Sequence, residues 1–136
     1  MKPKFRAWDK HRNEMNYRVM VGNCDTDDEN WTCPIIWIEE IQDWLHFDDY
    51  DSIMQSTGLF DKNGKEIFEG DILAVEADDG TLNVYVFWDE EHALFMFESK
   101  QYNEKEALAE LLEDNSYPFE IIGDIYKNPE LLEVEQ

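Results

Sequence analysis

Residues 53–72, IMQSTGLFDKNGKEIFEGDI, decide the fold of the second half of the chain. Asn63-Gly64 supplies the residue types that a tight turn with positive φ needs, and it lies between Leu59 and the apolar pair Ile67-Phe68. Gly70-Asp71 then precedes a β-branched and apolar run, which is typical of a strand. The stretch therefore predicts a β-hairpin that leads directly into a further strand.

The polar residues of this stretch have two interpretations. In the structural one, which we favour, the glycines supply backbone freedom and the polar side chains bond turn amides, while Ile67 and Ile72 pack inward. In the functional one, the polar residues form a shared binding surface. The residues concerned are Gln55, Thr57, Asp61 and Asp71.

The remainder of this half also has β character. Strands are expected at Ile72–Ala77, Leu82–Trp88, Ala93–Phe97 and Phe119–Tyr126, with turns at Asp79-Gly80 and 89–92. A helix is expected between the last two strands, because Asn103 and Glu106 have the spacing of a capping box and leucines follow at helical spacing. NPELL at 128–132 predicts a closing turn or helical turn. Short strands, tight turns and one helix before the last strand predict a small β-barrel.

The N-terminal part is predicted to be an extension that precedes the C-terminal core. Residues 4–21 predict two strands joined by a turn through Asp9–Asn13. Residues 22–34, rich in Gly, Asn, Asp and Pro, predict an exposed loop. Residues 35–47 suit a helix stripe or a strand, and we favour a short helix. The acidic loop at 46–52 places the domain boundary after residue 52, between an extension (1–52) and a core (53–136).

Three blocks of the sequence resemble the YopX family, whose members are small proteins encoded mainly by bacteriophages and prophages. They are the stretch at 53–72, FRAWD at 5–9 followed by Met15, and EIIGDIYKNPELL at 120–132. The blocks keep the family's order and approximate spacing over nearly the whole chain. Ser56 stands where the family would have an aromatic residue, and Asp124 where it would have Asn. The resemblance implies a C-terminal SH3-like barrel. It is specific for the family and implies no particular activity, because none is established for the family as a class.

The chain is strongly acidic, and its basic residues are concentrated near the N-terminus. Its formal net charge is −22, with 33 acidic and 11 basic residues. Residues 1–20 hold six bases and two acids, so the remainder holds five bases and 31 acids. Such a body repels nucleic acid and anionic membranes. The charge can serve solubility alone, or it can form a surface for a basic partner. The acidic candidates for that surface are Asp25, Asp27, Asp28, Glu29, Asp48, Asp49 and Asp51.

Mimicry of DNA is an alternative form of the acidic-surface hypothesis. Duplex DNA carries one charge per ~1.7 Å, so 22 charges correspond to ~37 Å of duplex. A compact domain of this length has a diameter of about 37 Å, which gives a comparable charge per unit length. A mimic would therefore inhibit a nucleic-acid-binding protein by occupying its basic site.

The residue patterns favour no catalytic, cofactor or metal site. Asp25, Asp27 and Glu29 have the alternate spacing of a calcium loop, but Asn30 and Ile36 stand where Gly and Glu are required. The three histidines and the two cysteines, Cys24 and Cys33, show no metal-binding spacing and no disulfide framework. We therefore expect a non-enzymatic protein of the bacterial cytoplasm. It would bind a host or phage protein with a basic surface, and neither nucleic acid nor membranes. A small hydrolase is the alternative of a different class.

Overall fold

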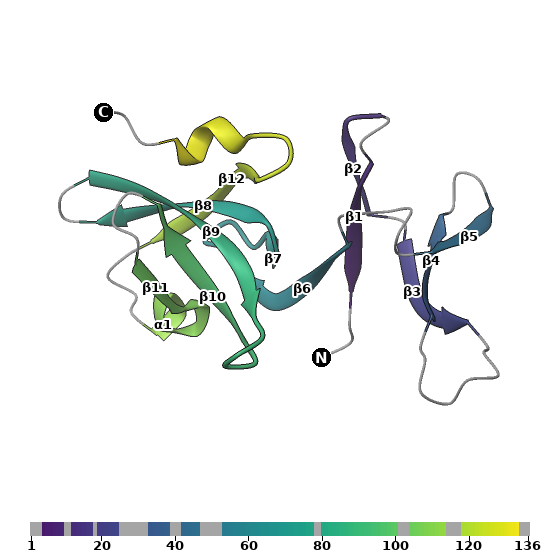
Figure 1. The fold of residues 1–136 in the computed structure, drawn as a ribbon. Coiled ribbons are helices and arrows are strands. Elements are labelled where there is room, and N and C mark those ends of the chain that lie inside the picture. The colour runs from purple at the N-terminus through teal and green to yellow at the C-terminus, as the bar shows by residue number, and fades with distance from the viewer. Residues whose placement is uncertain are drawn as a thin grey trace. The chain divides into compact units, whose positions relative to one another are not determined.

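The computed structural model describes residues 4–9, 12–17, 19–24, 33–38, 42–46, 53–77, 80–100, 104–113 and 118–133. In these residues the protein is mainly β, as predicted, with one α-helix and one 3-10 helix (Figure 1). The chain divides into two compact units, Met1–Gln55 and Ser56–Gln136. The division lies inside strand β6 (Ile53–Phe60). The boundary predicted from the sequence, after residue 52, falls directly before this strand.

The first unit begins with the predicted hairpin. Strand β1 (Phe5–Asp9) pairs with β2 (Glu14–Asn16), with Trp8 opposite Met15. The Arg12 amide donates to Oδ1 of Asp9 (3.1 Å), and Asn13 takes a positive φ of 57°, which asparagine tolerates well. The other edge of β1 pairs with the start of β6, where Phe5 lies opposite Gln55.

The same unit contains a second antiparallel sheet, which corrects one prediction. Its strands are β3 (Val19–Cys24), β4 (Cys33–Ile38) and β5 (Asp43–His46), in that order. The helix predicted within 35–47 is therefore wrong. Ile, Trp and Ile side chains favour extended backbone, and pairing with both neighbours outweighs the helical spacing of the apolar residues. The loop predicted at 22–34 is strand at 22–24 and 33–34, and residues 25–32 lie outside the described part.

The second unit is built on a curled antiparallel sheet (Figure 1). Its strand order is β11-β10-β9-β8-β12. The strands are β8 (Asp71–Ala77), β9 (Gly80–Asp89), β10 (Leu94–Ser99), β11 (Glu104–Ala107) and β12 (Phe119–Asp124). Before them, β6 turns back into β7 (Glu66–Phe68), with Phe60 opposite Glu66. The hairpin predicted at Asn63-Gly64 is confirmed, and Gly64 has a φ of +79°.

Alternate residues of these strands form the core of the second unit. Leu73 lies opposite Val84, and Phe97 opposite Val86, so each pair points to the same face of the sheet. Burial of such apolar side chains contributes about 1.5–3 kcal/mol each relative to exposure. The buried core residues are Ile67, Leu73, Val75, Val84, Val86, Phe97, Leu108 and Phe119.

The helix of the second unit begins later than the sequence predicts. Residues 104–107 form β11, in which Glu106 lies opposite Phe97, and helix α1 (Leu108–Glu113) follows. Glu106 therefore belongs to no capping box, and Asn103 lies outside the described residues. Pairing with β10 outweighs the local capping signal, while Leu108 still buries its side chain completely.

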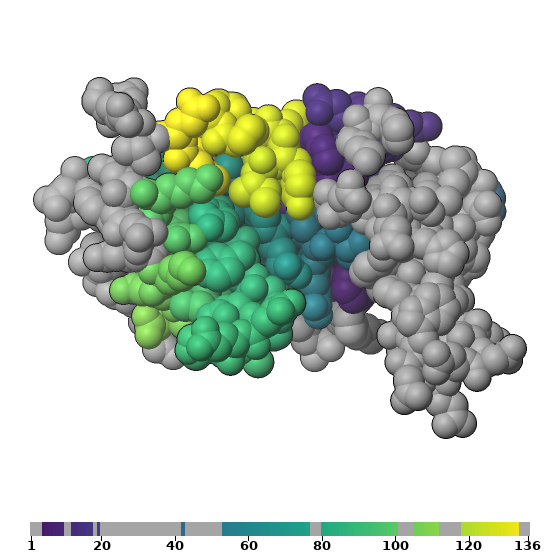
Figure 2. Space-filling model, in the orientation of Figure 1, coloured from purple at the N-terminus to yellow at the C-terminus, as the bar shows by residue number. Residues whose placement is uncertain are grey.

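The C-terminal segment covers part of the sheet. The 3-10 helix η2 (Pro129–Leu132) confirms the predicted turn, and the Leu131 carbonyl accepts a hydrogen bond from the Asn83 side-chain amide (2.9 Å). Figure 2 shows this yellow segment lying against the green strands. No helix in the described ranges has the length and apolar character needed to cross a membrane.

Candidate functional site

The Asp61 carboxylate lies at the centre of the sequence motif. Asp61 is only 7% exposed. Its Oδ1 accepts hydrogen bonds from the amides of Asn63 (3.0 Å) and Lys65 (2.8 Å), and its Oδ2 accepts one from the Ile121 amide (3.0 Å). The Lys62 amide also donates to the Phe119 carbonyl (3.3 Å). Asp61 therefore organises its own turn and joins that turn to the edge of β12.

These hydrogen bonds also set the acidity of Asp61. Burial would raise the pKa of its carboxyl group. The amides of Ile121, Lys65 and Asn63 favour the ionised form, as does the charge of Lys65, and together they outweigh burial. The pKa of Asp61 is consequently lower than its ordinary value. The side chain is thus held as a carboxylate with its oxygens directed to backbone amides.

Thr57 and Asp71, two other motif residues, are also buried. The Thr57 hydroxyl donates to the Ile67 carbonyl (2.7 Å) and accepts from the Leu59 amide (3.1 Å). Asp71 Oδ2 accepts the Phe68 amide (2.8 Å). These contacts fit the structural interpretation of the motif. A binding surface around Thr57, Asp61 and Asp71 stays a prediction, as does the part of partly buried Gln55.

The acidic candidates of the N-terminal part fall in two segments of the sequence, at 25–29 and 48–51. Asp25, Asp27, Asp28, Glu29, Asp48, Asp49 and Asp51 all lie outside the described residues. The described acidic side chains that are exposed lie on several elements, among them Glu76 on β8, Glu110 on α1 and Glu130 on η2. One further exposed group, Glu90 and Glu91, is found in the turn between β9 and β10.

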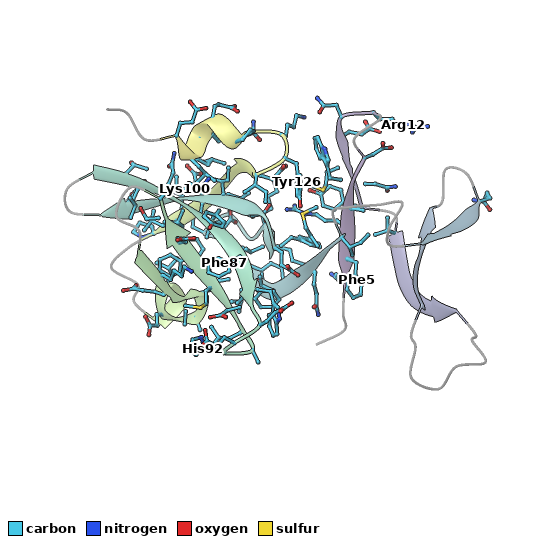
Figure 3. All side chains as sticks on the ribbon, in the orientation of Figure 1. Phe5, Arg12, Phe87, His92, Lys100 and Tyr126 are labelled. Carbon is cyan, nitrogen blue, oxygen red and sulfur yellow. The ribbon has the colours of Figure 1, made fainter. Side chains whose placement is uncertain are left out.

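This β9–β10 turn combines acidic, basic and aromatic side chains. Asp89 accepts the Glu91 amide through Oδ1 (3.0 Å), and its Oδ2 lies 2.7 Å from Nδ1 of His92. Figure 3 shows His92 at the end of the hairpin. Directly before the turn, Trp88 lies opposite Phe95, with ring centroids 5.0 Å apart in an edge-on arrangement. Trp88 remains 42% exposed, which is unusual for a residue of its size.

The Asp89–His92 pair shifts the acidity of both groups. The hydrogen bond to His92 lowers the pKa of Asp89. The same bond raises the pKa of His92, aided by the charges of Asp89 and Glu91. Each partner therefore favours the charged form of the other. The His92 side chain is 60% exposed and that of Asp89 is 18% exposed, and ion pairs with a solvent-exposed partner contribute little stability.

The same turn contains one set of potential metal ligands. Ligand atoms of Asp89, Glu91 and His92 lie within 4.8 Å of one another. All three come from one exposed turn, and Asp89 already bonds His92, so a divalent cation would have to displace that bond. That the protein holds no metal stays a prediction.

Sequence inspection missed an aromatic and basic surface on the outer face of the sheet. Tyr85 and Phe87 alternate with buried Val84 and Val86 along β9. Lys100 Nζ lies 5.8 Å from the Tyr85 ring centroid, and Lys105 Nζ lies 5.8 Å from that of Phe87. Burial, followed by a hydrogen bond to Glu98, raises the pKa of Tyr85 to about 12. The alternation in VYVFW at 84–88 was the available signal.

The comparisons with known proteins agree with this architecture. The family model described as YopX protein matches residues 4–133. Protein EF1440 from Enterococcus faecalis is 30% identical, with a TM-score of 0.65 and coverage of 98% of this chain and 99% of that one. YopX from Bacillus subtilis is 20% identical, with a TM-score of 0.60 and coverage of 96% and 98%. No curated protein matches. The family match spans nearly the whole chain, which therefore belongs to the YopX family.

Proposed function

We propose that this protein is a non-enzymatic interaction module, encoded by a phage or prophage and acting in the bacterial cytoplasm. It binds a host or phage protein that presents a basic surface. The observation that carries the proposal is the β9–β10 turn, where the exposed residues Glu90 and Glu91 follow Trp88 closely in sequence and the Trp88 side chain is half exposed. Acidic residues raise the association rate with a basic partner, and an exposed aromatic ring supplies a contact of high affinity.

The net charge of −22 supports the same proposal. A field of one sign steers an oppositely charged partner toward the protein over about 8 Å at physiological ionic strength. The Trp88 ring adds a contact that screening does not remove. Cationic side chains of a partner could stack on this ring while the neighbouring carboxylates balance their charge.

The test compares two variants that neutralise the same number of charges. A partner is first captured on the full-length protein at low salt. Its association and dissociation rates are then measured for Glu90→Gln/Glu91→Gln and for a control, Glu130→Gln/Glu133→Gln, on exposed residues in and after η2. We expect the first variant to lower the association rate severalfold, and the control to change it little. Trp88→Ala should mainly raise the dissociation rate.

Two outcomes would contradict this function. If binding is insensitive to salt and to both charge variants, the acidic residues serve solubility alone. If both variants lower the rate equally, the total charge acts rather than the turn. Recovery of a nucleic-acid-binding protein, released by duplex DNA, would favour DNA mimicry instead.

We also propose that the second unit is an SH3-like barrel, as the family resemblance implies. The proposal is supported by the curl of the five-stranded sheet and by the bonds of Asp61 and Lys62 that join the β6–β7 turn to β12. A strand-by-strand superposition of a crystal structure on SH3 domains would test it. A strand order in the crystal structure that differs from the order in SH3 domains would contradict the proposal.

A further inference from the structure

The only two cysteines of the chain, Cys24 and Cys33, are placed opposite each other by the register of the first unit. They form the last pair of the antiparallel ladder between β3 and β4. Eight residues separate them in sequence, and that spacing alone gives no reason to expect a pairing. Their juxtaposition follows from the strand register, which sets every pair from Val19 and Ile38 onward.

The proline next to Cys33 defines the kind of pair that the cysteines form. Pro34 lies opposite Asn23 and has no amide hydrogen, so this position must be a non-hydrogen-bonded pair of the ladder. Because the two kinds of pair alternate, Cys24 and Cys33 occupy a hydrogen-bonded position, in which the Cα atoms lie about 5.5 Å apart. This separation falls within the range of about 4.4–6.8 Å that disulfide bonds span. The Cβ atoms of a hydrogen-bonded pair lie nearer about 5.5 Å than the roughly 3.5–4.5 Å that a disulfide requires, so closure has to draw the two strand ends closer together.

We infer that Cys24 and Cys33 are a redox-active dithiol pair that closes to a disulfide across β3 and β4. The reactant is a low-molecular-weight disulfide, such as glutathione disulfide. One cysteine thiolate attacks a sulfur of this compound, and a glutathione thiolate leaves and takes up a proton. The second cysteine thiolate then attacks the mixed disulfide and releases the second glutathione thiol. Two protein thiols are oxidised, and one glutathione disulfide is reduced to two thiols.

This assignment is independent of the proposed interaction with a basic partner. In a reducing cytoplasm the pair is held as two thiols, as the composition of the chain leads us to expect. A lower ratio of glutathione to glutathione disulfide closes the bond. The position at the end of the ladder favours closure, because the two residues can adjust there without disturbing pairs on both sides.

The test is an equilibrium titration of the full-length protein in buffers of varied glutathione and glutathione disulfide ratio. Free thiols are counted, and non-reducing peptide mass analysis identifies the bonds. We expect both thiols to disappear together and a single intramolecular link between Cys24 and Cys33. The equilibrium constant for closure should be at least about tenfold larger in the folded chain than in the chain unfolded by urea.

Two single variants control for simple thiol reactivity. Cys24→Ser and Cys33→Ser each leave one thiol, which should bind one glutathione and form no intramolecular bond. The inference would be overturned if the parent protein also accumulated only glutathione adducts or linked dimers. Equal closure constants in the folded and unfolded chains would overturn it as well, because the fold would then contribute nothing to the pairing.

Discussion

Two turns of the second unit are each organised by an aspartate, yet they differ in what surrounds the carboxylate. Asp61 is buried and accepts three amides, one of which belongs to Ile121, far along the chain. Asp89 is partly buried and bonds close neighbours in its own turn, the Glu91 amide and the His92 ring. The first carboxylate connects strands, whereas the second shapes a single turn.

This difference separates a structural site from a surface that is available for binding. A buried acceptor cannot be removed without leaving amides that have no partner, so the Asp61 position tolerates little change. Solvent replaces the lost bonds at an exposed turn, so residues 89–92 can vary with the partner at small cost to stability. The predictions below test this contrast.

The largest effect is expected for Asp61→Ala. Loss of the carboxylate leaves the amides of Asn63, Lys65 and Ile121 without an acceptor, and we expect the free energy of unfolding to fall by roughly 3 kcal/mol or more. Asp89→Ala is the matched control. Urea denaturation of both variants measures the difference. Similar losses in the two variants would remove the contrast between the turns.

The backbone gives a second test of the contrast. Gly70 is buried with a φ of 85°, and its amide donates to the Val86 carbonyl (2.8 Å). We expect Gly70→Val to lower the free energy of unfolding by more than about 1 kcal/mol through backbone strain. In the exposed turn, Ala93 has a φ of 53°, and Ala93→Gly should stabilise by a few tenths of a kcal/mol. An unchanged melting temperature for Gly70→Val would reject the first expectation.

The stability contributed by Asp61 should depend on pH in a defined direction. Its pKa is lowered by folding, so its contribution is present above the ordinary value of 3.8 and is lost as the pH falls through the lower folded pKa. We expect the difference in unfolding free energy between the parent and Asp61→Asn to shrink in that acidic range. A difference that stays constant on acidification would show that the charge of Asp61 does not matter.

The smallest effect is expected for the exposed pair. The pKa of His92 is raised above 6.5, and that of Asp89 is lowered below 3.8. The His92 contribution is present below pH 6.5 and is lost as the pH rises through its folded pKa. The Asp89 contribution is lost as the pH falls through the folded pKa of Asp89. The pair therefore stabilises the folded protein most between pH 3.8 and pH 6.5. An NMR titration should show the His92 pKa returning toward 6.5 in Asp89→Asn, with little change in melting temperature.

Local turn chemistry was readable in the sequence because it depends on residues a few positions apart. Asn63-Gly64 predicted the β6–β7 hairpin, and NPELL predicted the turn that forms η2. Alternating apolar residues likewise predicted most strands of the second unit. The charge of −22 and the turn at 89–92 were also predicted from the sequence, but the acidic candidates named from it lie elsewhere, at 25–29 and 48–51.

Pairing between distant segments was decided only by the tertiary structure. Residues 35–38 and 104–107 carry helical signals, but hydrogen bonds to neighbouring strands make both of them extended. The bond from the Ile121 amide to Asp61 and the alignment of Cys24 with Cys33 depend on register, which no local pattern reveals. The exposure of Trp88, which directly precedes the acidic turn, likewise depends on the packing of the core, which leaves this side chain uncovered. Local propensities are worth tenths of a kcal/mol per residue, and the packing and pairing of whole strands outweigh them.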